Sequence, residues 1–533
     1  MSSSSPFWDF PHRSIRRPVL ADNVVATTQP VAAQAGLKML QAGGNAMDAA
    51  LASAIALTVV EPVMNGIGGD AFAIVWDGQA LHGLNASGRA PAAWTPEYFS
   101  QYDKMPGVGW DTVTVPGQVA GWFDLSKRFG RLPFADLFEP AIRYATKGFH
   151  VMPVISRIWA QQVELLKDQP GFAEAFLIDG KPPEMGTRWK FPDQAWALER
   201  IAQSNGRDFY EGELADRMVA FARETGGALR HQDLAQHVNE WVKPISMPYR
   251  DGYTLHEIPP NGQGIAALMG LGMLAHFDPP RARDDASGLF HLPIEAMKLA
   301  FADLAAYVGE PDSMGSLADQ LLDPDYLRSR AALINPNGVI DAAPGVPGNS
   351  GTIYLAAADE EGMVVSFIQS NYKGFGAGVV VPGTGIALHN RGTDFTLEPG
   401  HPNQVGPGKR PLNTIIPGFL TQHGKPVAGF GVMGGNMQAQ GHVQVVQQLV
   451  DLQCNAQAAI DAPRFRIQPG PEIWLEADVP PGVVSRLTEL GHDVRIQPAN
   501  SIDFGASQIV QLHAAGGYVA ASDPRRDGSA VGY

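Results

Sequence analysis

The fold is decided by the stretch Pro347-Gly348-Asn349-Ser350-Gly351-Thr352-Ile353-Tyr354-Leu355-Ala356-Ala357-Ala358. Its first half is a polar loop rich in proline and glycine. Its second half, from Thr352, is an apolar run with the length of a β-strand. The turn residues Asp359-Glu360-Glu361-Gly362 come next, and a second strand is predicted over 363–368. A β-branched residue commonly opens a strand after a turn, so the local pattern by itself predicts a hairpin and no chemistry at Thr352.

Working outward, the N-terminal part predicts alternating strands and helices. Strands are expected over 24–28 and 71–76, and helices over 30–40 and from Asn45 to about Glu61. Asn45 with Asp48 three residues later is typical of a capping box. Residues 134–240 read mostly as helices, another helix is expected over 293–307, and 310–350 are expected to be irregular. Strands and loops dominate from 352 to 435, before a helix over 438–450. The chain is therefore predicted to be an α/β (α+β) protein without a linker between independent domains.

The composition excludes several classes of protein. The chain has 533 residues, 17% of them charged, and a formal net charge of −15, so it has no general attraction to nucleic acid or to anionic membranes. Its one cysteine, Cys454, excludes an intramolecular disulfide and is expected to be a small buried hydrophobe. Neither a secretory signal nor an apolar stretch of transmembrane length is found, which predicts a cytoplasmic protein with no membrane partner.

Two glycine-rich motifs have the wrong context for phosphate binding. A dinucleotide loop follows a strand and opens a helix, but Gly66-Ile67-Gly68-Gly69-Asp70-Ala71 follows a predicted helix and opens a strand. The run Gly374-Phe375-Gly376-Ala377-Gly378 also leads into a strand. The sequence has no Walker A motif, HExxH or G-x-S-x-G, so neither a cofactor nor a metal is predicted.

Over residues 20–533 the sequence resembles the γ-glutamyltransferase (glutathione hydrolase) family of N-terminal-nucleophile hydrolases, and most of all its lidless glutathione hydrolase-like and acylase-like branch. The matching segments, in family order, are 41–50 (QAGGNAMDAA), 65–70 (NGIGGD), 83–91 (GLNASGRAP), 114–117 (TVPG), 295–298 (EAMK), 369–372 (QSNY), 375–378 (FGAG), 409–412 (KRPL) and 521–525 (ASDPR). The resemblance implies a four-layer αββα sandwich made as an inactive precursor. It also implies self-cleavage before Thr352, which gives a large subunit of residues 1–351 and a small subunit of residues 352–533 that together form one intertwined domain.

The catalytic roles that the resemblance implies fall on four residues. Thr352 becomes the N-terminal nucleophile. Its freed α-amine, with a pKa of about 8, is partly neutral at pH 7 and can act as the base that a hydroxyl needs. Ser370 stands where the family has a hydroxyl that hydrogen-bonds the nucleophile. Gly434 and Gly435 match the glycine pair whose N–H groups form the oxyanion hole.

The substrate-binding roles carry over less completely. Asn413 and Thr414 replace two serines that hold the α-carboxylate of the substrate, and Asp394 matches the acidic residue that pairs with its α-amino group. The family's carboxylate-binding arginine aligns with Ser87, but Arg89 two residues later is expected to take over this role, unless it is a surface arginine.

Tyr372 and Arg391 stand where the family has amide side chains that contact the substrate amino group. Because a guanidinium repels an ammonium, Arg391 is expected either to turn away or to be neutralised by Asp394. Pairing with Asp394 would weaken recognition of an α-ammonium, whereas an Arg391 in solvent would leave it intact. The loop over 399–407 is short where many members carry a lid, which predicts a pocket open to water and bulky substrates.

These residues predict an enzyme that cleaves γ-glutamyl amides through an ester on Thr352 and passes the acyl group to water or an amine. The expected partners are a glutathione-like small molecule and the two subunits of the same precursor, with no nucleic acid or membrane. The alternative is a glutaryl- or cephalosporin-type acylase, or another small amidase, on the same scaffold. A further alternative is an uncleaved, non-catalytic binding protein.

Overall fold

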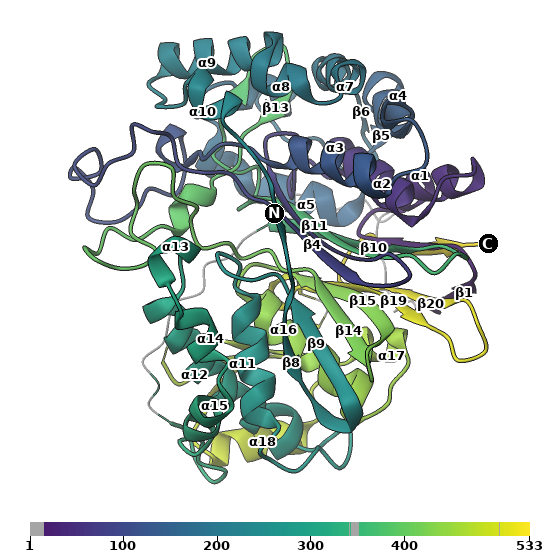
Figure 1. Cartoon of the computed structure of the whole chain (residues 1–533), viewed down its shortest axis with the longest axis vertical. Coiled ribbons are helices and arrows are strands. Elements are labelled where there is room, and N and C mark those ends of the chain that lie inside the picture. Colours follow the sequence, from purple (N-terminus) through teal and green to yellow (C-terminus); the bar gives the residue numbers. More distant parts are fainter. Residues whose placement is uncertain (1–14, 341, 343–350, 469, 500) are drawn as a thin grey trace.

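The computed structural model describes residues 15–340, 342, 351–468, 470–499 and 501–533. Two seven-stranded sheets lie face to face between two layers of helices (Figure 1). The first sheet contains, in spatial order, β1 (Val19–Ala21), β20 (Tyr518–Ser522), β19 (Ala506–Leu512), β15 (Lys425–Met433), β14 (Gly418–Gln422), β9 (Tyr253–Glu257) and β8 (Ile245–Pro248). The second contains β21 (Ser529–Gly532), β2 (Val24–Thr27), β10 (Gly351–Ala358), β11 (Val364–Tyr372), β3 (Asp70–Trp76), β4 (Leu81–Ala86) and β7 (Glu240–Val242). All neighbouring strands within these sheets are antiparallel.

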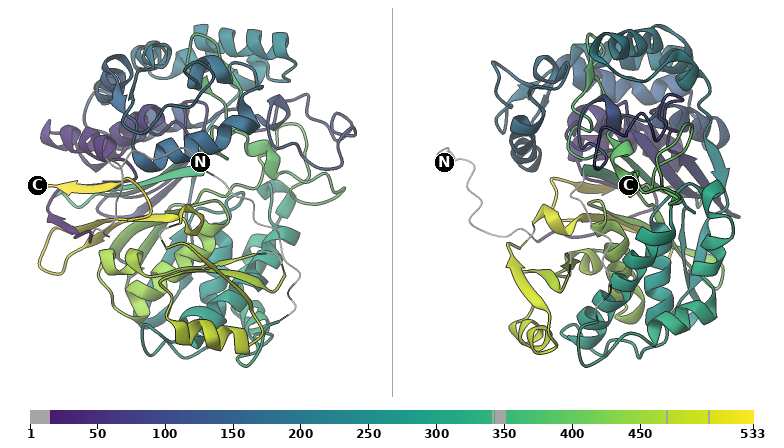
Figure 2. Two further views of the ribbon diagram at one scale, coloured as in Figure 1. Left: turned by 180° about the vertical axis from the view of Figure 1, so that it is seen from behind. Right: turned by 90° about the vertical axis from the view of Figure 1, so that its left-hand side faces the viewer.

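The helices form the outer layers, as Figure 2 shows from two further sides. Helices from the first half of the chain lie over the second sheet: α1 (Pro30–Gln41), α2 (Ala46–Val60), α3 (Gln118–Phe129), α4 (Glu139–Lys147), α5 (Pro153–Leu166), α6 (Phe172–Phe176), α7 (Pro192–Ser204), α8 (Arg207–Glu211), α9 (Glu213–Thr225) and α10 (His231–Ala235). The remaining helices lie on the side of the first sheet: α11 (Gly264–Leu274), α12 (Leu292–Tyr307), α13 (Pro311–Met314), α14 (Leu317–Leu321), α15 (Pro324–Ala331), α16 (Met437–Val446), α17 (Ala456–Asp461) and α18 (Pro481–Glu489). The predicted four-layer αββα sandwich is confirmed.

Smaller elements complete the two ends of the molecule. They are β5 (Phe149–His150) paired with β6 (Arg188–Trp189), β12 (Val380–Val381) paired with β13 (Ile386–Ala387), and a three-stranded sheet of β16 (Phe465–Ile467), β17 (Glu472–Glu476) and β18 (Asp493–Gln497). In the described part of the chain, no helix combines the length and the apolar character that crossing a membrane requires.

The apolar run of β10 is explained by burial of both of its faces. Ile353, Leu355 and Ala357 belong to the core under helices α1 to α3, while Tyr354 and Ala356 belong to the core between the two sheets. Since side chains alternate across a strand, a strand covered on both sides reads as continuously hydrophobic. β10 lies in the middle of its sheet, between β2 from before residue 351 and β11 from after it.

Helix α2 packs against the second sheet. Asn45 accepts hydrogen bonds from Met47 N and Asp48 N, and the Asp48 carboxylate accepts one from Asn45 N, so the predicted capping box is formed. Every residue of this alanine-rich helix is buried. A Cβ on Gly36 of α1 would lie 2.3 Å from the Ser53 hydroxyl of α2, which shows how closely these two helices pack.

Three expectations need correction or completion. Residues 310–350 were expected to be irregular, but α13, α14 and α15 occupy part of this range. Helices α13 and α15 each begin with a proline, where the missing N–H costs nothing, and α14 follows the Gly315 turn. Strand β11 runs on to Tyr372, beyond 368, because β3 pairs with it as far as Ser370. The loop 347–350 lies outside the described residues.

Candidate active site

Thr352, Ser370 and Asp70 lie side by side on three neighbouring strands. Ser370 of β11 pairs directly with Asp70 of β3, and the Thr352 Oγ1 of β10 is 3.1 Å from the Ser370 Oγ. All three side chains are fully buried. Thr352 lies on the same face of β10 as Tyr354, which belongs to the core between the sheets. Asp70 lies on the same face of β3 as Phe72, which belongs to that core too. A polar row therefore replaces the apolar core at one end of the sheet interface.

Ser370 links the polar row of Thr352, Ser370 and Asp70 to the end of β11. Its Oγ accepts a hydrogen bond of 2.7 Å from Tyr372 N, in addition to its contact with the Thr352 hydroxyl. Tyr372 has a φ of 75°, a left-handed conformation that costs a non-glycine residue about 1–3 kcal/mol. Such strain is typical of functional sites, and here it turns the chain so that the Tyr372 phenol donates a hydrogen bond to Asp394.

Gly434 and Gly435 occupy the connection between β15 and α16. Their φ values of 120° and 64° lie in the region that favours glycine. Their carbonyl groups accept hydrogen bonds from Met437 N and Gln438 N in the first turn of α16. Neither of their N–H groups donates to another described residue. Two N–H groups at a helix N-terminus are suited to an anionic oxygen.

Gln263 links the glycine pair to the rest of the site. Its Nε2 donates to Thr414 O at 2.5 Å and to Gly435 O at 2.8 Å. Its backbone N–H donates to Asn413 O, and the side chain is fully buried. Sequence reasoning missed Gln263, because a glutamine at the start of a helix carries no signal of such contacts. The residue fixes the glycine connection relative to Asn413 and Thr414.

Arg391 lies in the interior of the site, bound mainly to Asp70. Its Nε donates to Asp70 Oδ2 at 2.9 Å and its Nη2 to Asp70 Oδ1 at 3.3 Å. Its Nη1 donates to the Thr414 hydroxyl at 2.9 Å. Asp394 is a weaker partner, with its Oδ2 3.6 Å away. The expectation that Arg391 is either in solvent or neutralised by Asp394 is therefore corrected. The guanidinium is fully buried, and Asp70 is its principal counterion.

Arg391 and His389 hold Asp70 in its ionised form. Burial is the largest single influence and would raise the pKa of Asp70, but the charges and hydrogen bonds of Arg391 and His389 together outweigh it and hold the pKa at about 2. His389 lies 3.8 Å from the same carboxylate and is hydrogen-bonded to Thr114 through its other ring nitrogen. Asp70 is the last residue of the 65–70 motif, but no pattern in the sequence connects it with Arg391.

Asp394 is enclosed by its neighbours. One oxygen of Asp394 accepts a hydrogen bond from the Tyr372 phenol. Burial raises the pKa of Asp394, although Arg391 and Tyr372 both favour its ionised form. Burial and the Asp394 charge raise the pKa of Tyr372 well above its usual value, so this phenol remains a donor. Asn403 of the short 399–407 loop donates to Asp394 O at 2.5 Å. That loop therefore supports the pocket from its side.

Asn413 and Thr414 belong to the same buried polar cluster. The Asn413 amide donates to Asp70 Oδ2 at 2.7 Å, and its oxygen accepts from Ile415 N at 3.0 Å. The Thr414 hydroxyl accepts from Arg391 and retains its own proton for donation. Both side chains thus reach the polar cluster that also contains Arg391.

Arg89 lies in a separate ion-pair network. It donates to Glu240 at 2.8 Å, to Glu310 at 3.0 Å and to Gly408 O at 3.0 Å. Arg410 shares Glu240, with an N–O distance of 2.5 Å. Ser87 is buried and donates to the Asn85 amide oxygen at 2.6 Å. The contacts of Arg89 thus tie loops together, and its role in binding a substrate carboxylate stays a prediction.

One buried group in the described part of the chain has the atoms to hold a metal ion, namely His291, Glu295 and His492, whose ligand atoms lie within 4.8 Å of one another. The Lys298 ammonium binds one Glu295 oxygen at 2.8 Å, and Ile340 N binds the other at 2.6 Å. The two histidines contact each other at 2.9 Å. An ammonium already neutralises the carboxylate, so the group fits a structural ion pair better than a cation site.

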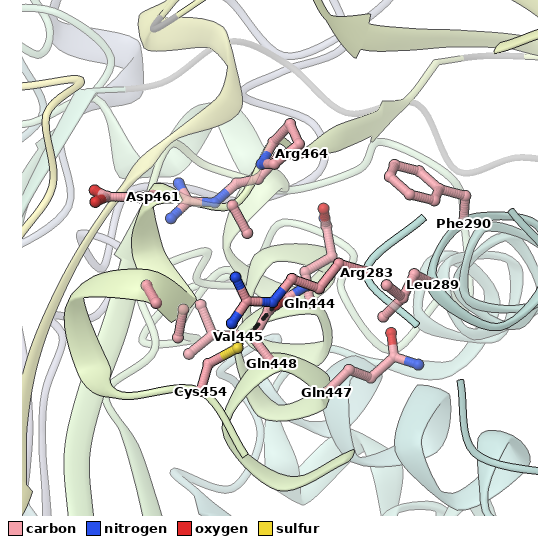
Figure 3. Close-up of a pocket in the computed structure, with 14 residues that line it drawn as sticks. Arg283, Leu289, Phe290, Gln444, Val445, Gln447, Gln448, Cys454, Asp461 and Arg464 are labelled. Atoms are coloured by element: carbon pink, nitrogen blue, oxygen red, sulfur yellow. Dashed lines mark hydrogen bonds between the residues drawn. The ribbon is translucent and has the colours of Figure 1, made fainter. Parts of the chain in front are cut away.

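A cavity of about 350 Å³ lies apart from these residues, between α16 and α17 (Figure 3). Arg283, Leu289 and Phe290 line it on one side, and Cys454 on another. The Cys454 thiol is buried, as predicted, and donates to the Gln448 amide oxygen at 3.6 Å. None of the predicted site residues lines this cavity.

Comparison with known proteins gives a consistent assignment. Residues 32–533 match the family described as Gamma-glutamyltranspeptidase. The glutathione hydrolase-like YwrD proenzyme of Bacillus subtilis is 33% identical, covering 96% of this chain and 98% of that protein. The oxamate amidohydrolase proenzyme of Klebsiella pneumoniae is 34% identical, covering 94% and 97%. The crystal structure of cephalosporin acylase from Bacillus halodurans has a TM-score of 0.94 and 45% identity, covering 99% of this chain and 98% of that one.

Proposed function

Because the chain belongs to the γ-glutamyltranspeptidase family of hydrolases, we propose that it is a self-processing amidohydrolase with Thr352 as its nucleophile. We further propose that its preferred acyl group carries a carboxylate but no α-ammonium, as in a glutaryl amide. The name proenzyme of both curated relatives supports a precursor that is processed into residues 1–351 and 352–533.

The reaction begins after the peptide bond between Gly351 and Thr352 is cut. The freed α-amine of Thr352 takes the hydroxyl proton, and Oγ1 attacks the amide carbon. The negative oxygen of the tetrahedral intermediate accepts hydrogen bonds from Gly434 N and Gly435 N. The α-ammonium then gives its proton to the leaving amine. Water repeats the sequence on the ester and releases the acid.

Ser370 is a positioning residue in this scheme. Its Oγ lies 3.1 Å from the nucleophile and is itself fixed by Tyr372 N at 2.7 Å. A serine held from its own strand restricts the Thr352 hydroxyl to one rotamer. The attack then starts from a defined geometry, which is a major part of the advantage of an enclosed site.

The observation that carries the acyl preference is the position of Arg391. The guanidinium is buried among Asp70, Thr414 and Asp394, and Asp394 already accepts a hydrogen bond from the Tyr372 phenol. A substrate ammonium about 4 Å from this guanidinium would be repelled by about 4 kcal/mol at an effective dielectric of about 20, before Asp70 and Asp394 offset part of it. A substrate carboxylate would be attracted by the same group and could accept from Asn413 and Thr414.

The second candidate is hydrolysis of γ-glutamyl amides, as predicted from the sequence. It is supported by Asp394, which stands at the family position for the acidic residue and lies in the same pocket as Asn413 and Thr414. The two candidates share every catalytic step and differ only in the acyl group. In both, the short 399–407 loop favours water over an amine as acceptor.

Matched glutaryl and γ-glutamyl 4-nitroanilides distinguish the candidates. We expect kcat/KM for the glutaryl compound to equal or exceed that for the γ-glutamyl compound. A hundredfold preference for γ-glutamyl, about 2.7 kcal/mol, would contradict the proposed acyl group and leave an ordinary glutathione hydrolase. The variant Arg391→Gln, which restores an amide at this position, should shift the ratio toward γ-glutamyl by about tenfold or more. Arg207→Gln serves as the comparison, because this exposed arginine of α8 pairs only weakly with Glu211.

A further inference from the structure

A histidine side chain holds the end of strand β15 where the neighbouring strand stops. Phe430 of β15 pairs with Gly418, the first residue of β14, so β14 does not extend alongside Val432. Val432 N donates instead to His442 Nε2 at 3.2 Å. A buried N–H beyond the end of its partner strand needs another acceptor, and the imidazole provides it.

This hydrogen bond spans the connection that contains the glycine pair. Val432 lies two residues before Gly434, and His442 lies in the second turn of α16. The first N–H groups of the same helix donate to the carbonyl groups of the two glycines. The bond between Val432 and His442 therefore fixes the strand that enters the connection relative to the helix that leaves it.

The two partners of His442 define its tautomer. A backbone N–H can only donate, so Nε2 must carry a lone pair toward Val432. The proton of the neutral ring is then on Nδ1, where Glu257 Oε1 accepts it at 2.6 Å. With the proton on Nε2, two N–H groups would face each other. Glu257, the last residue of β9, thus keeps the ring in the form that can accept from Val432.

Both side chains are completely buried and closely enclosed. A Cβ on Gly418 would lie 3.0 Å from His442 Cε1, and a Cβ on Gly264 would lie 2.7 Å from Glu257 Cβ. The centre of the Phe430 ring is 4.9 Å from that of the imidazole. Packing and two hydrogen bonds therefore set one orientation of the His442 ring.

Two glutamines hold the same connection from its helix side. Gln263 Nε2 donates to Gly435 O at 2.8 Å. Gln438, in the first turn of α16, accepts a hydrogen bond from Ile416 N at 3.0 Å. His442 acts on the strand side, and so complements these contacts.

We propose that His442 is a positioning residue for the oxyanion hole, and that Glu257 keeps it in the accepting tautomer. The proposal rests on the proposed function, because it takes Gly434 N and Gly435 N as donors to the oxyanion. Such donors act at about 2.7–3.1 Å from the developing charge. Release of Val432 would let the glycine pair move from this distance. Because that charge exists only in the transition state, kcat should fall while KM stays nearly constant.

The test uses variants that keep or remove the acceptor for Val432. His442→Gln retains a side-chain oxygen that can take the place of Nε2, whereas His442→Leu has none. With the 4-nitroanilide substrates, we expect kcat per processed chain to fall about tenfold or more in His442→Leu and about threefold or less in His442→Gln, with KM within about twofold. His256→Gln is the control, since His256 of β9 bonds to Thr421 and should leave kcat unchanged.

A merely structural role predicts a different pattern. In that case Tm and kcat would fall together, and to the same extent in His442→Gln and His442→Leu. Equal losses of kcat in these two variants would therefore overturn the proposal, as would a wild-type kcat in His442→Leu. If His442→Leu does not fold, Glu257→Gln takes its place, because an amide can also donate and so permits the other tautomer. An unchanged kcat in Glu257→Gln would again contradict the proposal.

NMR of isotopically labelled histidine separates this proposal from the proposed function. Long-range proton–nitrogen correlations report which ring nitrogen carries the proton, and the His442 signal is identified by its loss in His442→Gln. We expect Nδ1 to be protonated in the wild type, and a shift toward Nε2–H in Glu257→Gln. If neither anilide is hydrolysed, the proposed function fails, but this tautomer with faster hydrogen exchange at Val432 in His442→Leu would still support the positioning role. A wild-type proton on Nε2 would overturn it whatever the enzyme hydrolyses.

Discussion

Two buried arginines, Arg391 and Arg526, differ in their counterions. Arg391 has the Asp70 carboxylate at 2.9 Å, the Asp394 carboxylate at 3.6 Å and the Thr414 hydroxyl at 2.9 Å. Arg526 has a thioether sulfur and, among the described residues, no carboxylate within 4 Å. The charge of a guanidinium with two carboxylates is neutralised by its own neighbours, which hold it in one position. A buried guanidinium without a carboxylate is unfavourable unless another group completes it.

The largest effect is expected from removing the counterion of Arg391. Asp70→Asn leaves the buried guanidinium with Asp394 alone, and breaking a buried ion pair in this way costs about 3–5 kcal/mol of stability. Calorimetry of the variant should show a markedly lower Tm. Asp70→Asn combined with Arg391→Gln should recover part of the loss, because no unpaired charge remains.

Asp325→Asn is the matched control for this change, since it removes an exposed carboxylate that pairs with Arg328. It should alter stability by less than about 1 kcal/mol. If Asp70→Asn is as mild as Asp325→Asn, Arg391 is not held by Asp70, and the contrast between the two arginines disappears.

The next effect concerns the glycine connection between the two regions. In Gly434→Ala, the new Cβ would lie 3.2 Å from Gly505 Cα, at a φ of 120° that side chains rarely adopt. Displacing one oxyanion donor should lower kcat by about 10²–10³-fold, or about 2.7–4 kcal/mol, with a smaller effect on KM. Gly482→Ala in α18 meets open space and should leave kcat unchanged. An active Gly434→Ala enzyme would place the oxyanion hole elsewhere.

A further effect, spread over several pH units, tests whether Glu61 is a countercharge for Arg526. Burial raises its pKa to about 7, above the value of about 4.3 in an unfolded chain. Its contribution to stability is therefore complete below about pH 4.3 and is lost as pH rises toward 7, by about 1.4 kcal/mol per pH unit. Glu61→Gln should remove this dependence, so Tm measured from pH 4.5 to 7 should fall less steeply in the variant.

Glu164→Gln, on the exposed surface of α5, should keep the wild-type pH profile. Should Glu61→Gln also keep it, Glu61 is ionised at neutral pH. Arg526 would then have a full negative charge in its neighbourhood, and the difference between the two arginines would be smaller than described.

Local signals in the sequence were sufficient for much of the fold. The capping box at Asn45, the strand from Thr352 and the helix over 293–307 depend on residues close together in the chain. The short helices after Pro311 and Pro324 were missed because proline and glycine there were taken as loop residues. Helices of four to eight residues offer too few turns for a periodic pattern.

The site was accessible from sequence only where a motif placed it. Ser370 lies beside Thr352 as the family pattern implies, because the two strands form a hairpin. The sequence left Arg391 either in solvent or paired with Asp394, three residues away, whereas the structure gives Asp70, 321 residues away. Such a pairing depends on where the turn of residues 391–394 lies relative to β3, which no local pattern determines. Gln263 and the unpaired Arg526 required the three-dimensional structure for the same reason.

The central claim is that Thr352 becomes an N-terminal nucleophile, and intact mass spectrometry of the purified protein tests it most directly. The account predicts two chains in place of one of 57.0 kDa, with the smaller beginning at Thr352 and ending at Tyr533. Thr352→Ala should remain whole and should lose at least about 10⁴-fold in kcat, since both the nucleophile and its base are removed. A wild-type chain that stays at full length and still hydrolyses amides would contradict the account.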